Sequence, residues 1–187
     1  VMEAGKKYNI SPIHIATRMI QETGGKIDTN KSINGSTVVN GNVPYNFFNI
    51  GATPDANGNN SVTNGLIYAE NQGWLTPEAS INGGVSYLGA SYIDRGQNTM
   101  YFQKFDVNNE NGNLSALCAH QYMTNIMAPL NEAKRAYTSY LNAGMLDSAF
   151  EFHIPVYENM PSTPARVEDE YTYEKDATYM EVYNCSP

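Results

Sequence analysis

The chain has 187 residues, of which 41% are hydrophobic and 11% aromatic, so it is long enough for one folded domain and short for two. Its formal net charge of −8 and pI near 4.8 argue against binding to DNA or RNA through the phosphates, because no basic stripe exists. No apolar run reaches the length of a membrane span, and no metal-ligand spacing occurs among the cysteines and histidines. We therefore predict neither a metal nor a cofactor.

The N-terminal part of the chain is predicted to form two helices, over residues 1–8 and 12–23. Ser11 is a suitable N-cap for the second helix, and Pro12 suits its first position. Gly24 and the glycine after it are suitable to end this helix.

Glu22 lies near the end of this second helix, on its apolar side. Ile15 and Met19 precede it at spacings that place all three residues on one face. An apolar neighbourhood raises the pKa of a carboxyl group by desolvation, and the negative end of the helix dipole acts in the same direction. Glu22 is therefore a candidate proton donor of the kind that glycosidic bond cleavage needs. The alternative is an exposed glutamate at a fraying helix end.

The segment 31–64 is rich in Gly, Asn, Ser and Thr, and it is predicted to form a small β-hairpin lobe. Residues 36–39 and 42–45 are the expected strands, joined by a tight turn at 40–41. Pro44 restricts the second strand to an edge position.

Two further helices and an extended segment are predicted after the lobe. The first helix begins at Thr76 and ends near residue 95, and the second runs from residue 128 to a cap at Gly144. Both are expected to be mostly core, the second helix through the side formed by Leu130, Ala133, Tyr137, Tyr140 and Leu141. Residues 149–157 alternate apolar with polar, which predicts an edge strand or extended arm that packs Phe150, Phe152 and Ile154 on the domain.

The composition changes after about residue 161. Residues 166–187 hold six acidic and two basic residues, hence −4 of the total charge of −8, without helical periodicity. We therefore predict one domain over residues 1–161 and an acidic C-terminal tail or linker over residues 162–187.

Three separated motifs carry a resemblance to a known family. They are Gln21-Glu22-Thr23-Gly24-Gly25, the run YNFFNIGA that begins at Tyr45, and the run HQYMTNI that begins at His120. With the closing segment at 154–157 they cover about residues 5–161. The chain resembles the bacterial autolysin glucosaminidases, glycoside hydrolase family 73.

The resemblance implies an α+β fold that is predominantly α, a lysozyme-like helical domain in which the β-hairpin lobe forms one wall of a substrate groove. It also implies hydrolysis of the bond between N-acetylglucosamine and N-acetylmuramic acid in peptidoglycan glycan strands. Residues 1–161 would then be the catalytic domain of a monomeric protein secreted to the bacterial cell wall.

The resemblance also implies roles for individual residues. Glu22 matches the catalytic acid, and Tyr122 matches a tyrosine opposite that acid. A phenol donates a hydrogen bond to a substrate carbonyl or to the carboxylate. The residues expected to bind substrate are Tyr45, Asn46, Phe48 and Gln121. The alternatives are that Tyr122 is a packed tyrosine, that Asn46 is a turn residue and that Phe48 belongs to the core.

The sequence does not decide which group acts with Glu22 as the nucleophile or base. Asp55 is the only acid between residues 31 and 64, and it is a possible second carboxylate, although it lies in an ordinary turn sequence. Because the substrate carries a 2-acetamido group, its own carbonyl oxygen can replace a protein nucleophile, with Glu22 acting as acid and then as base. The alternative functions are a muramidase or lytic transglycosylase, and a non-catalytic glycan-binding module.

Overall fold

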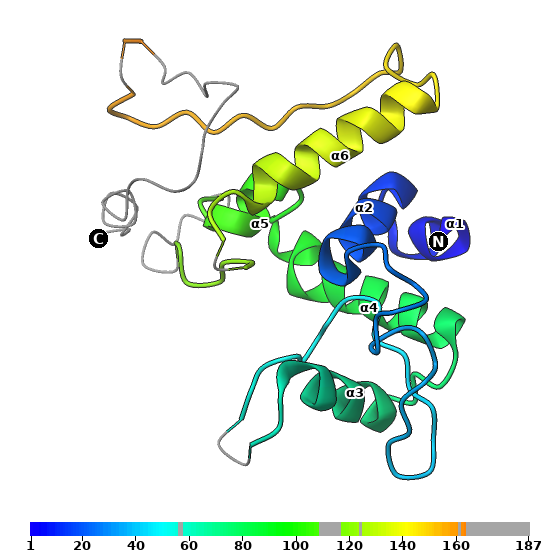
Figure 1. The fold of residues 1–187 in the computed structure, drawn as a ribbon. Coiled ribbons are helices and arrows are strands. Elements are labelled where there is room, and N and C mark those ends of the chain that lie inside the picture. The colour runs from blue at the N-terminus through cyan, green and yellow to red at the C-terminus, as the bar shows by residue number, and fades with distance from the viewer. Residues whose placement is uncertain (56–57, 109–116, 124, 161, 164–187) are drawn as a thin grey trace.

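The structure is a computed structural model that describes residues 1–55, 58–108, 117–123, 125–160 and 162–163. Its helices are α1 (Met2–Tyr8), α2 (Pro12–Thr23), α3 (Ser61–Asn71), α4 (Pro77–Ser91), the 3-10 helix η1 (Ile93–Arg95), α5 (Met100–Phe105) and α6 (Ala128–Asn142). The predominantly helical class predicted from the sequence is confirmed. α6 and α3 lie at opposite sides of the molecule, with α2 and α4 between them (Figure 1).

The predicted boundaries of α2 are confirmed by the contacts at both of its ends. The backbone N–H of His14 donates to Ser11 Oγ, and Pro12 occupies the first turn, where its missing N–H leaves no bond unmade. Gly24 has φ +69°, and its N–H donates to the carbonyl of Ile20. Glu22 therefore lies in the last turn of this helix.

The hydrophobic core forms where α1, α2 and α4 meet. Ile15 of α2 and Val85 of α4 are fully buried there, and Phe48 packs into the same cluster. Gly84 makes room for Phe48, since a Cβ at this glycine would lie 2.0 Å from the phenyl ring. The core thus fixes α2 and the segment that carries Phe48 against the same helix.

The predicted β-hairpin is reduced to its turn. Val39 and Asn42 exchange both backbone hydrogen bonds, each of 2.9 Å, around Asn40 and Gly41, which have φ of 50° and 85°. Beyond this isolated bridge, no strand occurs in the described ranges. The prediction of a two-stranded lobe was therefore wrong in its strands and correct in its turn.

Backbone groups at the end of the predicted 42–45 strand either are missing or bond to other residues. Pro44 has no N–H, and the N–H of Tyr45 donates to the carbonyl of Trp74 at 2.9 Å. The N–H of Asn46 donates to the carbonyl of Ser32 at 2.7 Å. The first bond joins the 31–46 loop to the segment before α4, and the second closes the loop on its own start, so neither belongs to a strand ladder.

α6 buries a different side from the one predicted. Ala128, Glu132 and Ala136 face the protein, whereas Tyr137 and Leu141 are 59% and 51% exposed. The two alanines allow α6 to approach α2 and α5, with which it packs. The apolar periodicity of this helix therefore indicated the wrong face.

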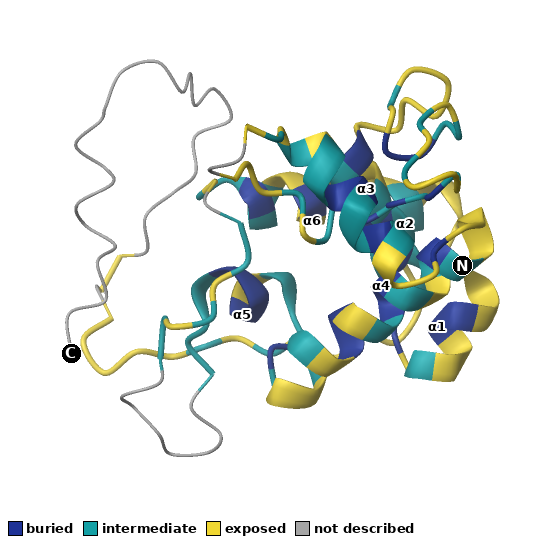
Figure 2. Cartoon of the chain, turned by 90° about the horizontal axis from the view of Figure 1, so that it is seen from below, coloured by how far each residue is buried: buried dark blue, intermediate teal, exposed yellow. Residues whose placement is uncertain are grey.

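The segment after α6 is extended but does not pack as predicted. Phe152 and Ile154 are each 77% exposed, and Phe150 contacts the ring of Tyr140 edge-on at 5.2 Å. An edge strand needs a sheet, and the described residues form none, so the 149–157 segment lies on the surface and is coloured as exposed over most of its length (Figure 2).

α3 and α5 were not predicted. α3 contains β-branched residues and a glycine, which weaken the helical pattern, and its N-cap is Asn60, whose side chain accepts from the N–H of Thr63. α5 has only six residues, too few for a periodic signal, and is capped by Thr99. No helix within the described ranges has both the length and the hydrophobicity that crossing a bilayer requires.

Candidate active site

Glu22 and Tyr122 meet in the folded chain although 100 positions separate them. The Tyr122 hydroxyl donates a hydrogen bond to Glu22 Oε1, and both side chains are half-buried. The structure thus brings together the two residues to which the sequence assigned catalytic roles.

The backbone around Tyr122 is held by α5. The N–H of Tyr122 donates to the carbonyl of Gln103 at 2.7 Å. Lys104 Nζ donates to the carbonyl of Met123 at 2.5 Å, and Met123 adopts a left-handed φ of 56°. Two consecutive residues of one short helix therefore fix the turn of the 117–123 loop that presents the phenol.

The ring of Tyr122 lies between a cation and a second aromatic ring. The guanidinium carbon of Arg18 is 3.8 Å from the ring centroid, and the Tyr92 ring contacts it edge-on at 5.9 Å. These contacts set the plane of the phenol, so its hydroxyl is directed at Glu22.

A buried polar network lies below this pair. Arg18 Nε donates to Glu132 Oε1 at 2.6 Å, and Arg18 Nη2 donates to Gln103 Oε1 at 2.6 Å. The three residues are 3%, 1% and 0% exposed, respectively. The network joins α2, α6 and α5, and the sequence reasoning did not find it. A signal was available, since Arg18 precedes Glu22 by one helical turn and Glu132 is the charged member of the small-residue stripe of α6.

Burial raises the pKa of Glu22 from about 4.5 to about 7. Desolvation is the largest cause, and the nearby charge of Glu132 adds to it. The Arg18 cation and a hydrogen bond from Asn49 act in the opposite direction but do not cancel the desolvation. Glu22 therefore holds a proton up to neutral pH, as a general acid requires.

Asn49 ties the 46–52 loop to the end of α2. Its side-chain amide donates to the backbone carbonyl of Glu22, and its backbone is left-handed, with φ 49°. Sequence reasoning treated this run as a source of groove residues and gave Asn49 no role.

Asn46 is buried, with 1% of its surface exposed, and it organises the same loop. Its amide nitrogen donates to the carbonyls of Ile50 (2.9 Å) and Gly65 (2.7 Å), and its oxygen accepts from the N–H of Ile50 at 3.2 Å. The side chain thus connects the loop to α3.

We expect Asn46→Ala to lower the free energy of unfolding by about 3 kcal/mol, because it leaves several buried backbone groups without partners. Urea denaturation measures this, with Asn82→Ala on the exposed side of α4 as the matched control. A loss below about 0.5 kcal/mol, the usual size of a surface effect, would contradict this role for Asn46.

The other residues expected to bind substrate differ in exposure. Gln121 is exposed beside Tyr122, and Tyr45 is half-buried with its hydroxyl against Gly35. Phe48 is 8% exposed and belongs to the core cluster. Of these three, Gln121 and Tyr45 have surface available for a ligand.

Asp55 is exposed and organises its own turn. Its two carboxylate oxygens accept from the backbone N–H and the side-chain amide of Asn59, at 3.1 and 3.2 Å. Glu70 similarly accepts from the side chains of Asn40 and Asn42 across the tight turn. Both carboxylates thus have structural contacts, and neither is among the groups that act on the pKa of Glu22.

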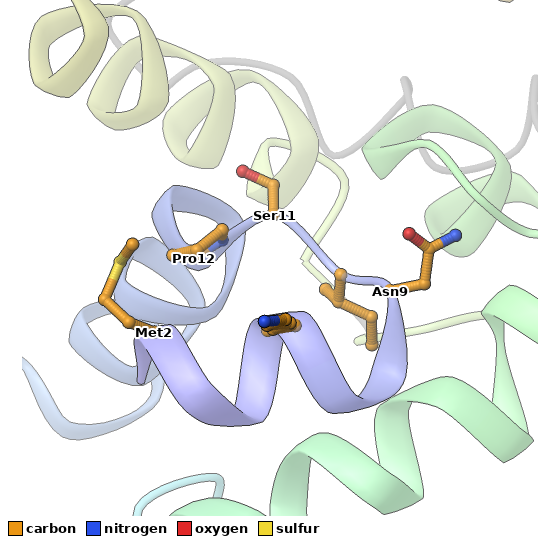
Figure 3. A pocket seen from close by; sticks show the side chains of 7 residues that line it. Met2, Asn9, Ser11 and Pro12 are labelled. Carbon is orange, nitrogen blue, oxygen red and sulfur yellow. The ribbon is translucent and has the colours of Figure 1, made fainter.

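Two surface hollows lie apart from the Glu22 and Tyr122 contact. One, of about 340 Å³, lies between α1 and the start of α2 and is lined in part by Met2, Asn9 and Pro12 (Figure 3). The other, of about 750 Å³, lies between the 29–39 loop and α3. Neither is lined by the two site residues, so the candidate site is defined by its side-chain contacts.

Comparison with known proteins finds glucosaminidases and autolysins. No family model matches the chain. The β-N-acetylglucosaminidase of Bacillus subtilis (strain 168) is 34% identical over 160 residues, which are 83% of this chain and 16% of that protein. A bifunctional autolysin of Staphylococcus epidermidis is 30% identical over 163 residues, covering 83% of this chain and 11% of that protein. The chain belongs to the autolysin glucosaminidase family.

Solved structures of this family share the fold. A catalytic mutant of S. aureus autolysin E, with glutamate replaced by alanine and in complex with the disaccharide NAG-NAM, superimposes with a TM-score of 0.58 at 27% identity, covering 76% of this chain and 58% of that one. A major bifunctional autolysin gives a TM-score of 0.53 at 26% identity, covering 77% and 54%. The chain spans less than a fifth of the curated family members that it matches.

Proposed function

We propose that this domain hydrolyses the β-1,4 bond between N-acetylglucosamine and N-acetylmuramic acid in peptidoglycan and leaves N-acetylglucosamine at the new reducing end. The observation that carries the proposal is the contact between the Tyr122 hydroxyl and Glu22 Oε1, on a carboxyl group whose pKa is raised to about 7. The names of the related proteins, and the disaccharide bound to one of their structures, support the same substrate.

The proposed mechanism uses Glu22 twice. Protonated Glu22 donates its proton to the glycosidic oxygen as the bond to the anomeric carbon breaks. The carbonyl oxygen of the substrate's 2-acetamido group attacks that carbon from the opposite face and forms a cyclic oxazolinium ion. The Glu22 carboxylate then takes a proton from water, which opens the ring with net retention. Tyr122 orients the acetamide and the carboxyl group.

This scheme gives Asp55 no chemical step. The proposal rests on the turn contacts of Asp55 with Asn59 and on the substrate's ability to supply the nucleophile. Asp55 remains the possible second carboxylate against which the scheme is tested, and Asp55→Asn is the variant that tests it.

The remaining parts of the proposal concern the surroundings of the site. Tyr45 and Gln121 contact the glycan. Asn46 and Phe48 are buried and act indirectly, because they hold the 31–64 segment that forms one wall of the groove. Residues 1–161 form the catalytic domain and residues 162–187 an acidic tail or linker, of which 164–187 lie outside the described residues. The protein acts as a monomer, secreted to the bacterial cell wall.

Mass spectrometry of the fragments released from purified peptidoglycan tests the function. Fragments with reducing-end N-acetylglucosamine support the proposal. Reducing-end N-acetylmuramic acid would indicate a muramidase, and an anhydro sugar would indicate a lytic transglycosylase. Binding to the polymer without any release would indicate a glycan-binding module.

The raised pKa of Glu22 predicts a pH dependence. Because the acid must be protonated to donate, we expect kcat/KM, which reports the free enzyme, to fall tenfold for each pH unit above about 7. An ordinary glutamate, with a pKa near 4.5, would place this decline more than two units lower. Initial rates on labelled peptidoglycan at constant ionic strength from pH 4 to 9 measure the profile. A rate that is flat from pH 6 to 9 would contradict the role of Glu22 as the acid.

A further inference from the structure

Arg18 lies directly against the catalytic pair, yet the proposed reaction gives it no part. Its guanidinium contacts three groups at once: the face of the Tyr122 ring, the carboxylate of Glu132 and the side-chain oxygen of Gln103. The backbone carbonyl of Gln103 in turn accepts from the backbone N–H of Tyr122. One buried side chain therefore connects the helix of the acid, the loop of the phenol and the two helices behind them.

We propose that Arg18 is a positioning residue for the glycosidase reaction, with its planar guanidinium supporting the Tyr122 phenol and Glu132 holding that guanidinium in place. The inference rests on the proposed function, because it assigns Arg18 a part in that reaction. Arg18 acts through Tyr122 and Glu22 and does not itself touch the sugar.

The shape of the guanidinium explains why the position holds arginine. Arg18 donates from Nε and Nη2 to two acceptors in different directions, at 2.6 Å each, while its flat face lies 3.8 Å from the Tyr122 centroid. A lysine carries the same charge as a single point on a flexible stem, so it cannot reach both acceptors and support the ring together.

The pairing of Arg18 with Glu132 also affects the pKa of Glu22. An unpaired guanidinium one helical turn from Glu22 would favour the carboxylate form, and the carboxylate of Glu132 opposes this effect. The charged or titratable groups that face Glu22 are Arg18 on its own helix, Glu132 on α6, Tyr122 on the 117–123 loop and Tyr92 at the end of α4. Arg18 and Glu132 act on the pKa of Glu22 in opposite directions, on top of the larger effect of desolvation, so removing one of them shifts that pKa.

Two variants separate the charge from the geometry. Glu132→Gln keeps an oxygen acceptor for Arg18 and removes the opposing charge, whereas Arg18→Lys keeps the cation and removes the planar group. The matched controls are Glu3→Gln and Arg135→Lys, both at exposed positions on helices. For each protein, kcat and KM are measured across pH, and the titration of the Glu22 carboxyl is followed by carbon-13 NMR.

For Glu132→Gln we expect the Glu22 titration and the alkaline limb of kcat to move to lower pH together, by about one pH unit. For Arg18→Lys we expect a 10- to 100-fold lower kcat, on the order of the loss from a misplaced catalytic group, with KM little changed. We expect neither change in the controls. An unshifted Glu22 titration in Glu132→Gln, or an Arg18→Lys kcat within twofold of wild type, would overturn the proposal.

The experiment distinguishes failure of this inference from failure of the proposed function. If the wild-type protein releases no reducing-end N-acetylglucosamine, the function is wrong, while the NMR titration still tests the coupling of Glu22 to the Arg18 and Glu132 pair. If Arg18→Lys does not fold, as judged by near-ultraviolet circular dichroism, Gln103→Met tests the positioning role in its place, since it removes one acceptor of the guanidinium and keeps the backbone bond to Tyr122. A Gln103→Met kcat within twofold of wild type would then overturn the proposal.

Discussion

Replacing Glu22 with glutamine is expected to reduce kcat on peptidoglycan about 10³-fold, because general acid catalysis contributes roughly this much and glutamine has no proton to transfer. The substitution keeps the size of the side chain and an oxygen that accepts from Tyr122, so we expect glycan binding to persist. Release of labelled fragments and a pull-down on insoluble peptidoglycan measure the two properties separately.

The same substitution is expected to stabilise the protein above neutral pH. The pKa of Glu22 is raised in the folded state, so folding becomes less favourable as the pH rises from about 4.5 to about 7, and the full penalty is present above that range. Glutamine is neutral throughout and carries no such penalty. Urea denaturation should therefore show Glu22→Gln to be more stable than wild type at pH 8 and similar to it at pH 4.

The controls for Glu22→Gln are Glu3→Gln, at an exposed position on α1, and Asp55→Asn. Both are expected to keep wild-type activity. Activity of Glu22→Gln within tenfold of wild type would rule out Glu22 as the acid. An Asp55→Asn variant as damaged as Glu22→Gln would show that a second carboxylate takes part.

Tyr122→Phe is expected to lower kcat about 100-fold, the usual cost of removing one donor from a preorganised site. The phenyl ring stays in contact with Arg18 and Tyr92, so the free energy of unfolding should change little. Losing the donor to its carboxylate also raises the pKa of Glu22, so the alkaline limb of kcat should move to higher pH.

Tyr137→Phe is the matched control for this variant, because Tyr137 is 59% exposed on α6. We expect it to behave as wild type in rate, in pH profile and in urea denaturation. A Tyr122→Phe variant with wild-type kcat and an unmoved pH profile would show that the phenol is only a packing group.

The sequence was most informative where local signals agreed with the tertiary structure. The N-cap at Ser11, the stop at Gly24 and the apolar stripe that leads to Glu22 predicted α2 and the half-buried position of Glu22 correctly, because each depends on neighbouring residues only. The position of Tyr122 depended on the family resemblance, since nothing local indicates that a loop 100 positions away meets Glu22.

The errors arose where distant contacts decide the structure. The second strand of the lobe did not form: Pro44 has no backbone N–H, and Tyr45 donates its backbone N–H to the distant Trp74, a contact that no local pattern reveals. The buried face of α6 was missed because a buried arginine needs a carboxylate, and Glu132 is satisfied only by a partner on another helix. Periodicity counts apolar residues and therefore cannot register such a pair.

The support of the phenol by α5 has a consequence for heat inactivation. Six residues are too few to remain helical alone, so the backbone anchor of Tyr122 depends on α5 staying docked against its neighbours. A helix held only by tertiary contacts loses its shape once those contacts loosen, before longer helices unwind. During a temperature ramp, enzymatic turnover should therefore cease before the far-ultraviolet signal of the longer helices declines, and cooling at that stage should restore it.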